Sequence, residues 1–174
     1  MKRALTLALL FVLAATGTSV AADQVIFLVR HAERADQGAP AMPAAAHGML
    51  PNDPPLSEAG KVRAAKLAAL LASADVKTIF TTEFKRTRET AAPLAEKTKV
   101  RPVMSASQDP QPLIEAVQKT KGNVLIVGHS NTVPDLLKRL GVKETITIAD
   151  NEYDNLFIIV RRDAGEPTFV RLRY

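Results

Sequence analysis

Two apolar segments of this chain end in the same way, at a histidine. Residues 25–29 are Val-Ile-Phe-Leu-Val and lead into Arg30-His31, and residues 124–127 are Val-Leu-Ile-Val and lead into Gly128-His129. Short unbroken apolar runs of this kind are typical of buried parallel strands. Ligands of open α/β sheets bind at the carboxyl ends of such strands. If the two strands are neighbours, both histidines lie in one crevice.

Segments with helical periodicity alternate with apolar strand segments along the rest of the chain. We expect helices over residues 57–72, 85–97, 112–119 and 133–140, with Ser57 capping the first and Gly141 ending the last. Further strands are expected over 76–81, 100–104, 156–161 and 168–174. The strand over 100–104 is expected at a sheet edge, and the one over 168–174 is expected to be antiparallel or at an edge, with one face exposed to solvent. This alternation predicts a three-layer α/β/α sandwich around a mostly parallel central sheet.

The first 22 residues have the pattern of a secretory signal. Lys2 and Arg3 precede the apolar run 4–15, and small residues lead to Ala21-Ala22 before Asp23. We therefore expect a signal peptide over 1–22, one domain over 23–174, and a periplasmic or secreted protein without stable membrane insertion after cleavage. The alternative is an uncleaved membrane anchor, which the short apolar run disfavours.

Composition excludes several kinds of chemistry. The chain has no cysteine, so disulfides, thiolate catalysis and thiolate metal sites are excluded. Removing Lys2 and Arg3 from the 23 basic residues leaves 21 against 18 acidic ones, so the net charge falls from +5 to +3. This weak positive charge and the 5% aromatic content suit a small anionic substrate rather than nucleic acid.

A third segment carries a candidate anion ligand. Residues 81–91, Thr-Thr-Glu-Phe-Lys-Arg-Thr-Arg-Glu-Thr-Ala, follow a strand and place Arg86 in the first turn of the next helix. The planar guanidinium matches phosphate oxygens, and a helix N-terminus attracts anions. Arg86 is thus expected to reach the crevice of the two histidines, while Arg34 and Arg88 are expected at the surface.

These segments together resemble the histidine phosphatase superfamily, which has the phosphoglycerate mutase-like fold. The sequence Leu28-Val29-Arg30-His31-Ala32 resembles its opening Arg-His-Gly motif, and 56–60 is similar to its Leu-Thr-Glu-x-Gly helix start. Residues 81–91 and 128–130 resemble its Arg-containing and Gly-His segments. The resemblance implies a phosphate pocket formed by Arg30, His31, Arg86 and His129. Ala32 in place of the usual glycine is tolerable if its φ is not positive.

The resemblance also implies a mechanism. His31 would attack phosphorus to form phosphohistidine, which water then hydrolyses; Arg30 and Arg86 would hold the oxygens, and His129 would donate a proton. No cofactor or metal is expected, because the arginines supply positive charge. The acid that protonates the leaving group is unassigned. Its candidates are Glu33, Asp53 and Glu152, although Glu33 equally suits an arginine partner and Asp53 a turn.

Several alternatives remain open on the sequence. The expected substrate is a small phosphorylated molecule or a phosphorylated envelope component. A protein phosphohistidine phosphatase or a non-catalytic phosphate-binding module would use the same residues. His47 is expected to be an exposed loop residue rather than a metal ligand, Tyr153 is a minor candidate for the pocket rim, and Asn131 is expected to cap the helix that follows it.

Overall fold

The computed structural model describes residues 23–36, 53–162 and 165–174. The predicted signal peptide, most of the proline-rich loop and His47 lie outside the described residues. In the described part, no helix has the length and apolar character that crossing a membrane requires.

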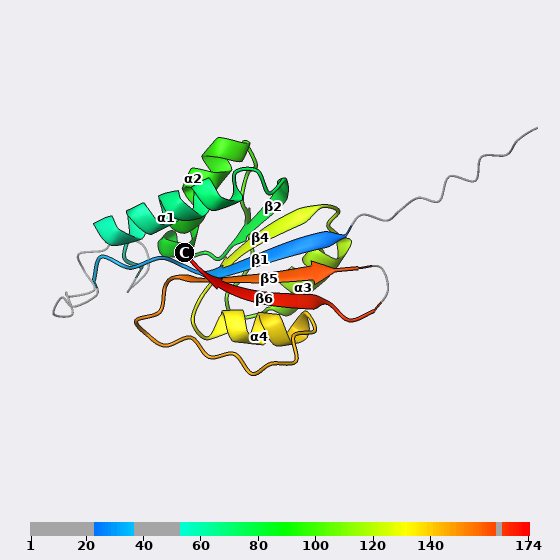
Figure 1. The fold of residues 1–174 in the computed structure, drawn as a ribbon. Helices are drawn as coiled ribbons and strands as arrows, with labels where there is room; N and C mark the ends of the chain where they lie inside the picture. The colour runs from blue at the N-terminus through cyan, green and yellow to red at the C-terminus, as the bar shows by residue number, and fades with distance from the viewer. Residues whose placement is uncertain (1–22, 37–52, 163–164) are drawn as a thin grey trace, which may run out of the picture.

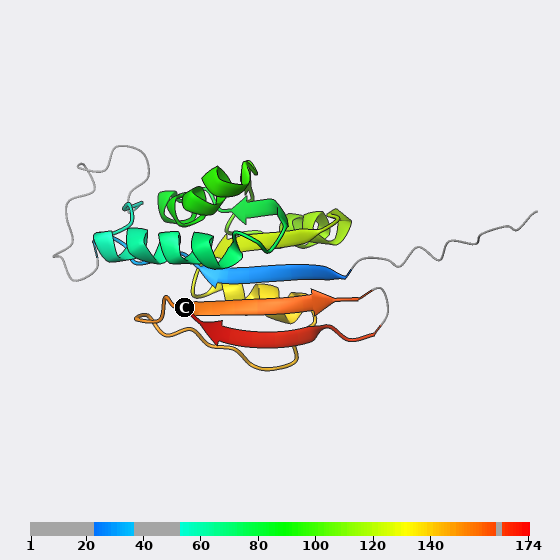
Figure 2. The same ribbon diagram turned by 45° about the horizontal axis from the view of Figure 1, so that its top comes forward.

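The sheet has six strands in the order β3-β2-β4-β1-β5-β6 (Figures 1 and 2). Four are parallel: β1 (Gln24–Arg30), β2 (Val76–Thr81), β3 (Val103–Met104) and β4 (Asn123–Gly128). The last two, β5 (Asn155–Arg161) and β6 (Thr168–Arg173), are antiparallel. The prediction of a mostly parallel sheet is therefore confirmed. The critical point is that β1 and β4 are direct neighbours, with Arg30 in register with Gly128.

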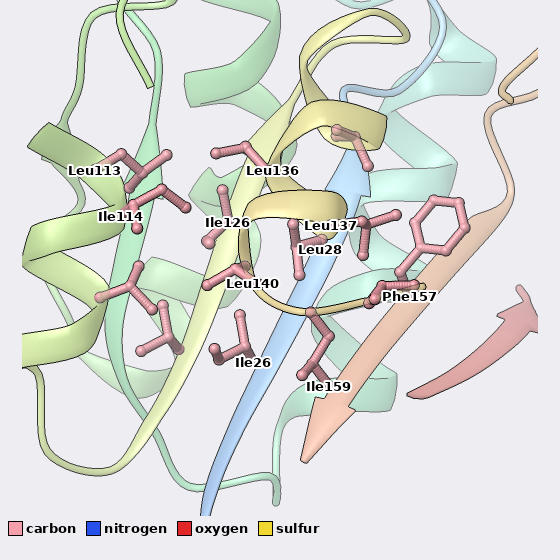
Figure 3. Packing of buried hydrophobic residues seen from close by; sticks show 14 of the residues in the cluster. Ile26, Leu28, Leu113, Ile114, Ile126, Leu136, Leu137, Leu140, Phe157 and Ile159 are labelled. Carbon is pink, nitrogen blue, oxygen red and sulfur yellow. The ribbon is translucent and has the colours of Figure 1, made fainter. Parts of the chain in front are cut away.

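Helices cover both faces of the sheet, which gives the predicted three layers (Figure 1). Helices α1 (Glu58–Leu71) and α2 (Lys85–Thr98) pack on one face, where Leu67 and Leu94 meet Val29 and Leu125. Helices α3 (Gln111–Lys119) and α4 (Thr132–Arg139) pack on the other. Figure 3 shows that second core, in which side chains of α3 and α4 pack against β1, β4 and β5. Both faces of β1 and β4 are buried, which explains why their sequences are continuously apolar.

Local signals in the sequence explain where the elements begin and turn. The Ser57 side chain caps α1 as predicted, accepting a hydrogen bond from the Gly60 backbone N–H at 3.1 Å. Gly60 lies so close to the chain after β1 that an added Cβ would stand 2.3 Å from the Glu33 carbonyl oxygen. The backbone N–H of Ser57 also donates to that oxygen at 2.9 Å. The start of α1 is thus fixed directly beside the end of β1.

Two strand predictions need correction. The edge strand expected over 100–104 pairs only at Val103–Met104, because the backbone N–H groups of a strand are interrupted at Pro102. The last strand does not have one buried and one wet face. Val170 and Leu172 are 41% and 48% exposed, because this strand lies at the sheet edge, beyond the cover of α1.

Candidate active site

The nucleophile candidate His31 stands directly after β1, and its backbone N–H donates to the Gly128 carbonyl of β4 at 2.9 Å. Its ring Nδ1 lies 2.8 Å from the carbonyl oxygen of Ala32. A carbonyl only accepts, so Nδ1 carries the proton and Nε2 keeps its lone pair. Among the described non-glycine residues, only Asp75 and Lys99 have a positive φ. The backbone at position 32 therefore does not require glycine, and Ala32 fits there. The ring is fixed in the tautomer that leaves Nε2 free to attack.

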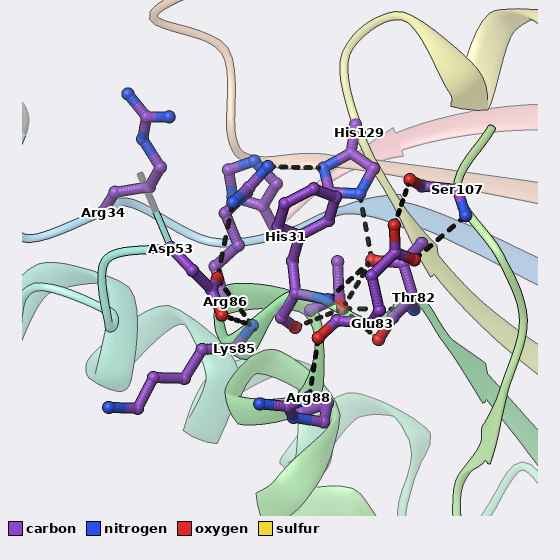
Figure 4. Close-up of polar contacts among 12 residues, drawn as sticks. His31, Arg34, Asp53, Thr82, Glu83, Lys85, Arg86, Arg88, Ser107 and His129 are labelled. Carbon is purple, nitrogen blue, oxygen red and sulfur yellow. Dashed lines mark hydrogen bonds and ion pairs between the residues drawn. The ribbon is translucent and has the colours of Figure 1, made fainter. Parts of the chain in front are cut away.

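His129 follows β4 and brings its ring within 5.3 Å of the His31 ring, centroid to centroid. Its Nδ1 lies 3.4 Å from Arg86 Nη2, and its Nε2 lies 3.0 Å from the hydroxyl of Thr82 (Figure 4). A guanidinium only donates, so Nδ1 accepts and Nε2 carries the proton. His129 is therefore neutral in this structure, and donating a proton from Nδ1 requires it first to gain one.

Burial keeps both histidines uncharged. Desolvation lowers the pKa of His31 to about 3. The hydrogen bond to the Ala32 carbonyl opposes this shift, whereas electrostatic repulsion from His129 and Arg86 adds to it. Desolvation likewise lowers the pKa of His129 to about 4, and the neighbouring Arg86 charge adds to this. A neutral imidazole is the nucleophilic form, so His31 is ready to react at neutral pH.

Arg30 is buried and divides its donors between the protein and the pocket. Its Nη1 donates to the carbonyls of Ala149, Asp150 and Glu152, and its Nη2 donates to the Tyr153 hydroxyl at 3.0 Å. Its Nε has no hydrogen-bond partner among the described residues. Desolvation lowers the pKa of this guanidinium, although a guanidinium stays charged. Arg30 thus fixes the loop before β5, and one buried donor remains for a ligand.

Arg86 lies in the first turn of α2, as predicted, and stacks on Phe84 with its guanidinium carbon 4.1 Å from the ring centre. Its Nε and Nη1 are buried and make no hydrogen bond with the described residues. Burial lowers the pKa of Arg86, and the positive charge of Arg34 adds to this. Unpaired buried donors are costly in a folded protein, so these atoms mark a place where an anion is favoured.

All four predicted site residues line one pocket of about 870 Å³ at the carboxyl ends of the parallel strands. The wall also includes residues of the loops before α3, α4 and β5, and of the first turn of α4: Ser107, Gln108, Pro110, Ser130, Asn131, Thr132, Asp135, Asp150 and Tyr153. Arg34 lines it too, so the prediction of a surface role for that residue is wrong. Its guanidinium pairs with Asp36 at 3.1 Å and stays partly exposed. Arg88 is exposed, as predicted.

The three predicted acid candidates are all engaged elsewhere. The Glu33 carboxylate accepts hydrogen bonds from Nε and Nη2 of Arg63, which lies on α1, at 2.6–2.9 Å. Burial opposes its ionisation, but the Arg63 hydrogen bonds and charge outweigh this and lower its pKa. Glu152 is held by Arg173 and Arg171, and the Arg173 hydrogen bond lowers its pKa. Neither carboxyl group lines the pocket.

Asp53 and Asn131 differ most from their predicted roles. Asp53 is neither a turn residue nor a pocket acid: its two oxygens accept from the backbone N–H of Lys85, and it pairs with Arg86. Asn131 occupies the N-cap position of α4, but its side chain makes no capping bond. The Thr132 hydroxyl instead accepts from the His129 backbone N–H at 2.9 Å. Asn131 is left on the pocket wall, where its amide can meet a ligand.

Thr82 and Glu83 were not identified from the sequence as residues that support the site. The Thr82 hydroxyl is the hydrogen-bond partner of His129 Nε2. The Glu83 carboxylate accepts from the Ser107 N–H and hydroxyl and so fixes Ser107 on the pocket wall. Both follow β2 directly, so the strand-end position was the available signal. Among the described residues, no group of three or more His, Asp or Glu side chains is arranged to hold a metal ion.

The fold and the site define an α/β protein with a pocket lined by two histidines and three arginines. A sequence profile of the histidine phosphatase superfamily, branch 1, matches residues 26–108. Over these 83 of the 174 residues, the chain is similar to that superfamily. A search of the curated proteins by sequence found no match.

Solved structures share the fold at low sequence identity. A putative phosphohistidine phosphatase SixA from Agrobacterium tumefaciens is 21% identical, with a TM-score of 0.61 over 86% of this chain and 98% of that one. A protein histidine phosphatase SixA complexed with tungstate is 16% identical, with a TM-score of 0.64 over 86% and 96%. A mycobacterial glucosyl-3-phosphoglycerate phosphatase is 12% identical, with a TM-score of 0.62 over 86% and 97%.

Proposed function

We propose that this protein is a phosphatase that transfers a phosphoryl group to His31 and then to water. The observation that carries the proposal is the tautomer of His31. Its Nδ1–H is held by the Ala32 carbonyl, and its unprotonated Nε2 faces a pocket with buried, unpartnered arginine nitrogens. Those nitrogens suit the oxygens of a phosphoryl group, and the free lone pair suits attack on phosphorus.

The reaction proceeds in two steps. In the first, a bond forms between His31 Nε2 and phosphorus while the bond to the leaving group breaks, and the leaving group takes the electron pair. In the second, water attacks phosphorus, the P–N bond breaks, and phosphate leaves. Arg30 Nε and Arg86 stabilise charge on the non-bridging oxygens in both steps. His129 joins them once the bound anion allows it to take up a proton.

A specific observation favours a second candidate substrate, a phosphoramidate such as phosphohistidine. None of Glu33, Asp53 and Glu152 lines the pocket, because each is engaged by other groups, and the sequence of residues 37–52 contains no carboxylate. Among the described carboxylates, Asp135 and Asp150 are the two on the pocket wall. A leaving imidazole needs less help from an acid than an alkoxide does. One of the fold relatives is described as a putative phosphohistidine phosphatase and another as a protein histidine phosphatase.

The test is a trapping experiment. Purified protein is incubated with labelled aryl phosphate or with phosphohistidine and quenched rapidly under alkaline conditions, which preserve phosphohistidine. We expect labelled protein from the wild type and neither label nor turnover from His31→Ala. Turnover that survives His31→Ala, or that a chelator abolishes, would contradict the mechanism and favour metal-assisted hydrolysis. Phosphate binding without any turnover would favour the non-catalytic module instead.

We also propose that the protein acts outside the cytoplasm, on a small phosphorylated molecule or an envelope component. The support is the basic and apolar pattern of residues 1–22. Mass spectrometry of protein from its native host should find a chain that starts at Ala22 or Asp23. A full-length cytoplasmic species would contradict this proposal.

A further inference from the structure

The carboxylate of Asp53 lies outside the pocket and forms an ion pair with Arg86, which lines the pocket. Asp53 lies at the end of the loop that joins β1 to α1, against the N-terminus of α2. The Lys85 backbone N–H donates to its two oxygens at 2.8 and 2.9 Å, and its Oδ1 lies 3.6 Å from Arg86 Nη1 (Figure 4). The side chains of Asp53 and Arg86 are only 10% and 11% exposed. Among the described residues, Asp53 is the one carboxylate that forms an ion pair with Arg86.

The other contacts of Arg86 hold it weakly. Its guanidinium stacks on Phe84, and its Nη2 reaches His129 Nδ1 at 3.4 Å, which is long for a hydrogen bond. The positive charge of Arg34 repels it. An arginine side chain also loses rotamer freedom when it is fixed in one place. Without a counter-charge, this side chain has little reason to stay in the pocket.

From this arrangement we propose that Asp53 is a positioning residue that holds Arg86 ready for the phosphoryl group. The inference rests on the proposed function, because it assigns Arg86 to the phosphate. At 3.6 Å the pair attracts without forming a hydrogen bond, so the hydrogens of Arg86 Nη1 stay available to a ligand. Asp53 does not line the pocket, so it acts through Arg86.

The same junction provides a matched control. Glu89, on α2, accepts a hydrogen bond from the Leu56 backbone N–H at 2.7 Å. Asp53 and Glu89 therefore both pin the end of the same loop to the same helix, but only Asp53 pairs with Arg86. Asp53→Asn and Glu89→Gln each remove one negative charge and keep an accepting oxygen. Any difference between them reports on Arg86 rather than on the loop.

The experiment measures the affinity for orthophosphate by calorimetry, together with the kcat and KM for an aryl phosphate. We expect Asp53→Asn to weaken phosphate binding and lower kcat/KM by about tenfold each, the cost of a misplaced clamp. Glu89→Gln should stay within about twofold of the wild type, as a change remote from the anion should. In an Arg86→Gln background, which has no charge for Asp53 to hold, Asp53→Asn should have no further effect on phosphate affinity. Asp53→Ser, which keeps a capping oxygen without the charge, is measured in parallel in case the amide variant does not fold.

Three results would overturn the inference. The first is an unchanged or tighter phosphate affinity in both Asp53 variants, which would mean that the charge only weakens anion binding. The second is an equal loss in Glu89→Gln, and the third is an equal loss with and without Arg86. Because phosphate binding needs no turnover, a wild type that binds phosphate without hydrolysing any ester contradicts only the proposed function.

Discussion

The two buried histidines make the stability of the protein depend on pH in a range where carboxylates do not yet titrate. Their pKa values, about 3 for His31 and about 4 for His129, lie below the ordinary 6.5 because burial disfavours the charged ring. The folded protein therefore binds fewer protons than the unfolded chain. Stability is full above pH 6.5 and falls as the pH drops toward 4.

The size of this effect follows from the pKa differences. At about pH 5.5, one unit below the ordinary value, each histidine is mostly protonated in the unfolded chain and neutral in the fold. Each then costs about 1.4 kcal/mol, and both together about 3 kcal/mol. Glu33 and Glu83 also have lowered pKa values, from an ordinary 4.5, so their contribution is lost only at still lower pH.

The assay is urea unfolding followed by circular dichroism at about pH 8 and about pH 5.5. The wild type should lose about 3 kcal/mol of unfolding free energy between the two, and the His31→Asn, His129→Asn double variant should lose almost none. A wild type that changes by less than about 1 kcal/mol, or a double variant with the same loss, would refute the conclusion that these rings are buried as neutral groups.

Three further predictions follow from the same contacts. His129→Ala should slow turnover by about a hundredfold with the fold intact, as loss of one transition-state donor does; steady-state kinetics and circular dichroism check this. Thr82→Val leaves the buried His129 Nε2–H without an acceptor and should cost about 1–3 kcal/mol in urea unfolding as well as a lower kcat. Glu33→Gln weakens the half-buried pair with Arg63 and should lower the unfolding free energy by about 1–3 kcal/mol while kcat stays unchanged. A large kcat loss in Glu33→Gln would return that residue to the list of catalytic acids.

The sequence alone determined the elements that carry the site. The apolar runs before His31 and His129 predicted two buried strands, and both strands form within one residue of the expected bounds. Ser57 and the helical periodicity of residues 57–72 predicted α1, whose buried face includes Leu67, Ala68 and Leu71. These signals are local: capping and the period of apolar residues depend on neighbours in the chain, so they can be read without knowing the fold.

Only the tertiary structure decided which side chains of the site contact one another. It made β1 and β4 neighbours, and so placed the two histidine rings 5.3 Å apart. It removed Glu33 from the candidate acids by placing Arg63 beside it, and it turned Asp53 into the partner of Arg86. A charged side chain takes its role from whichever opposite charge the fold brings within a few ångströms. Arg63 is 30 residues from Glu33 and Arg86 is 33 from Asp53, so no pattern of neighbours in the chain encodes either pair.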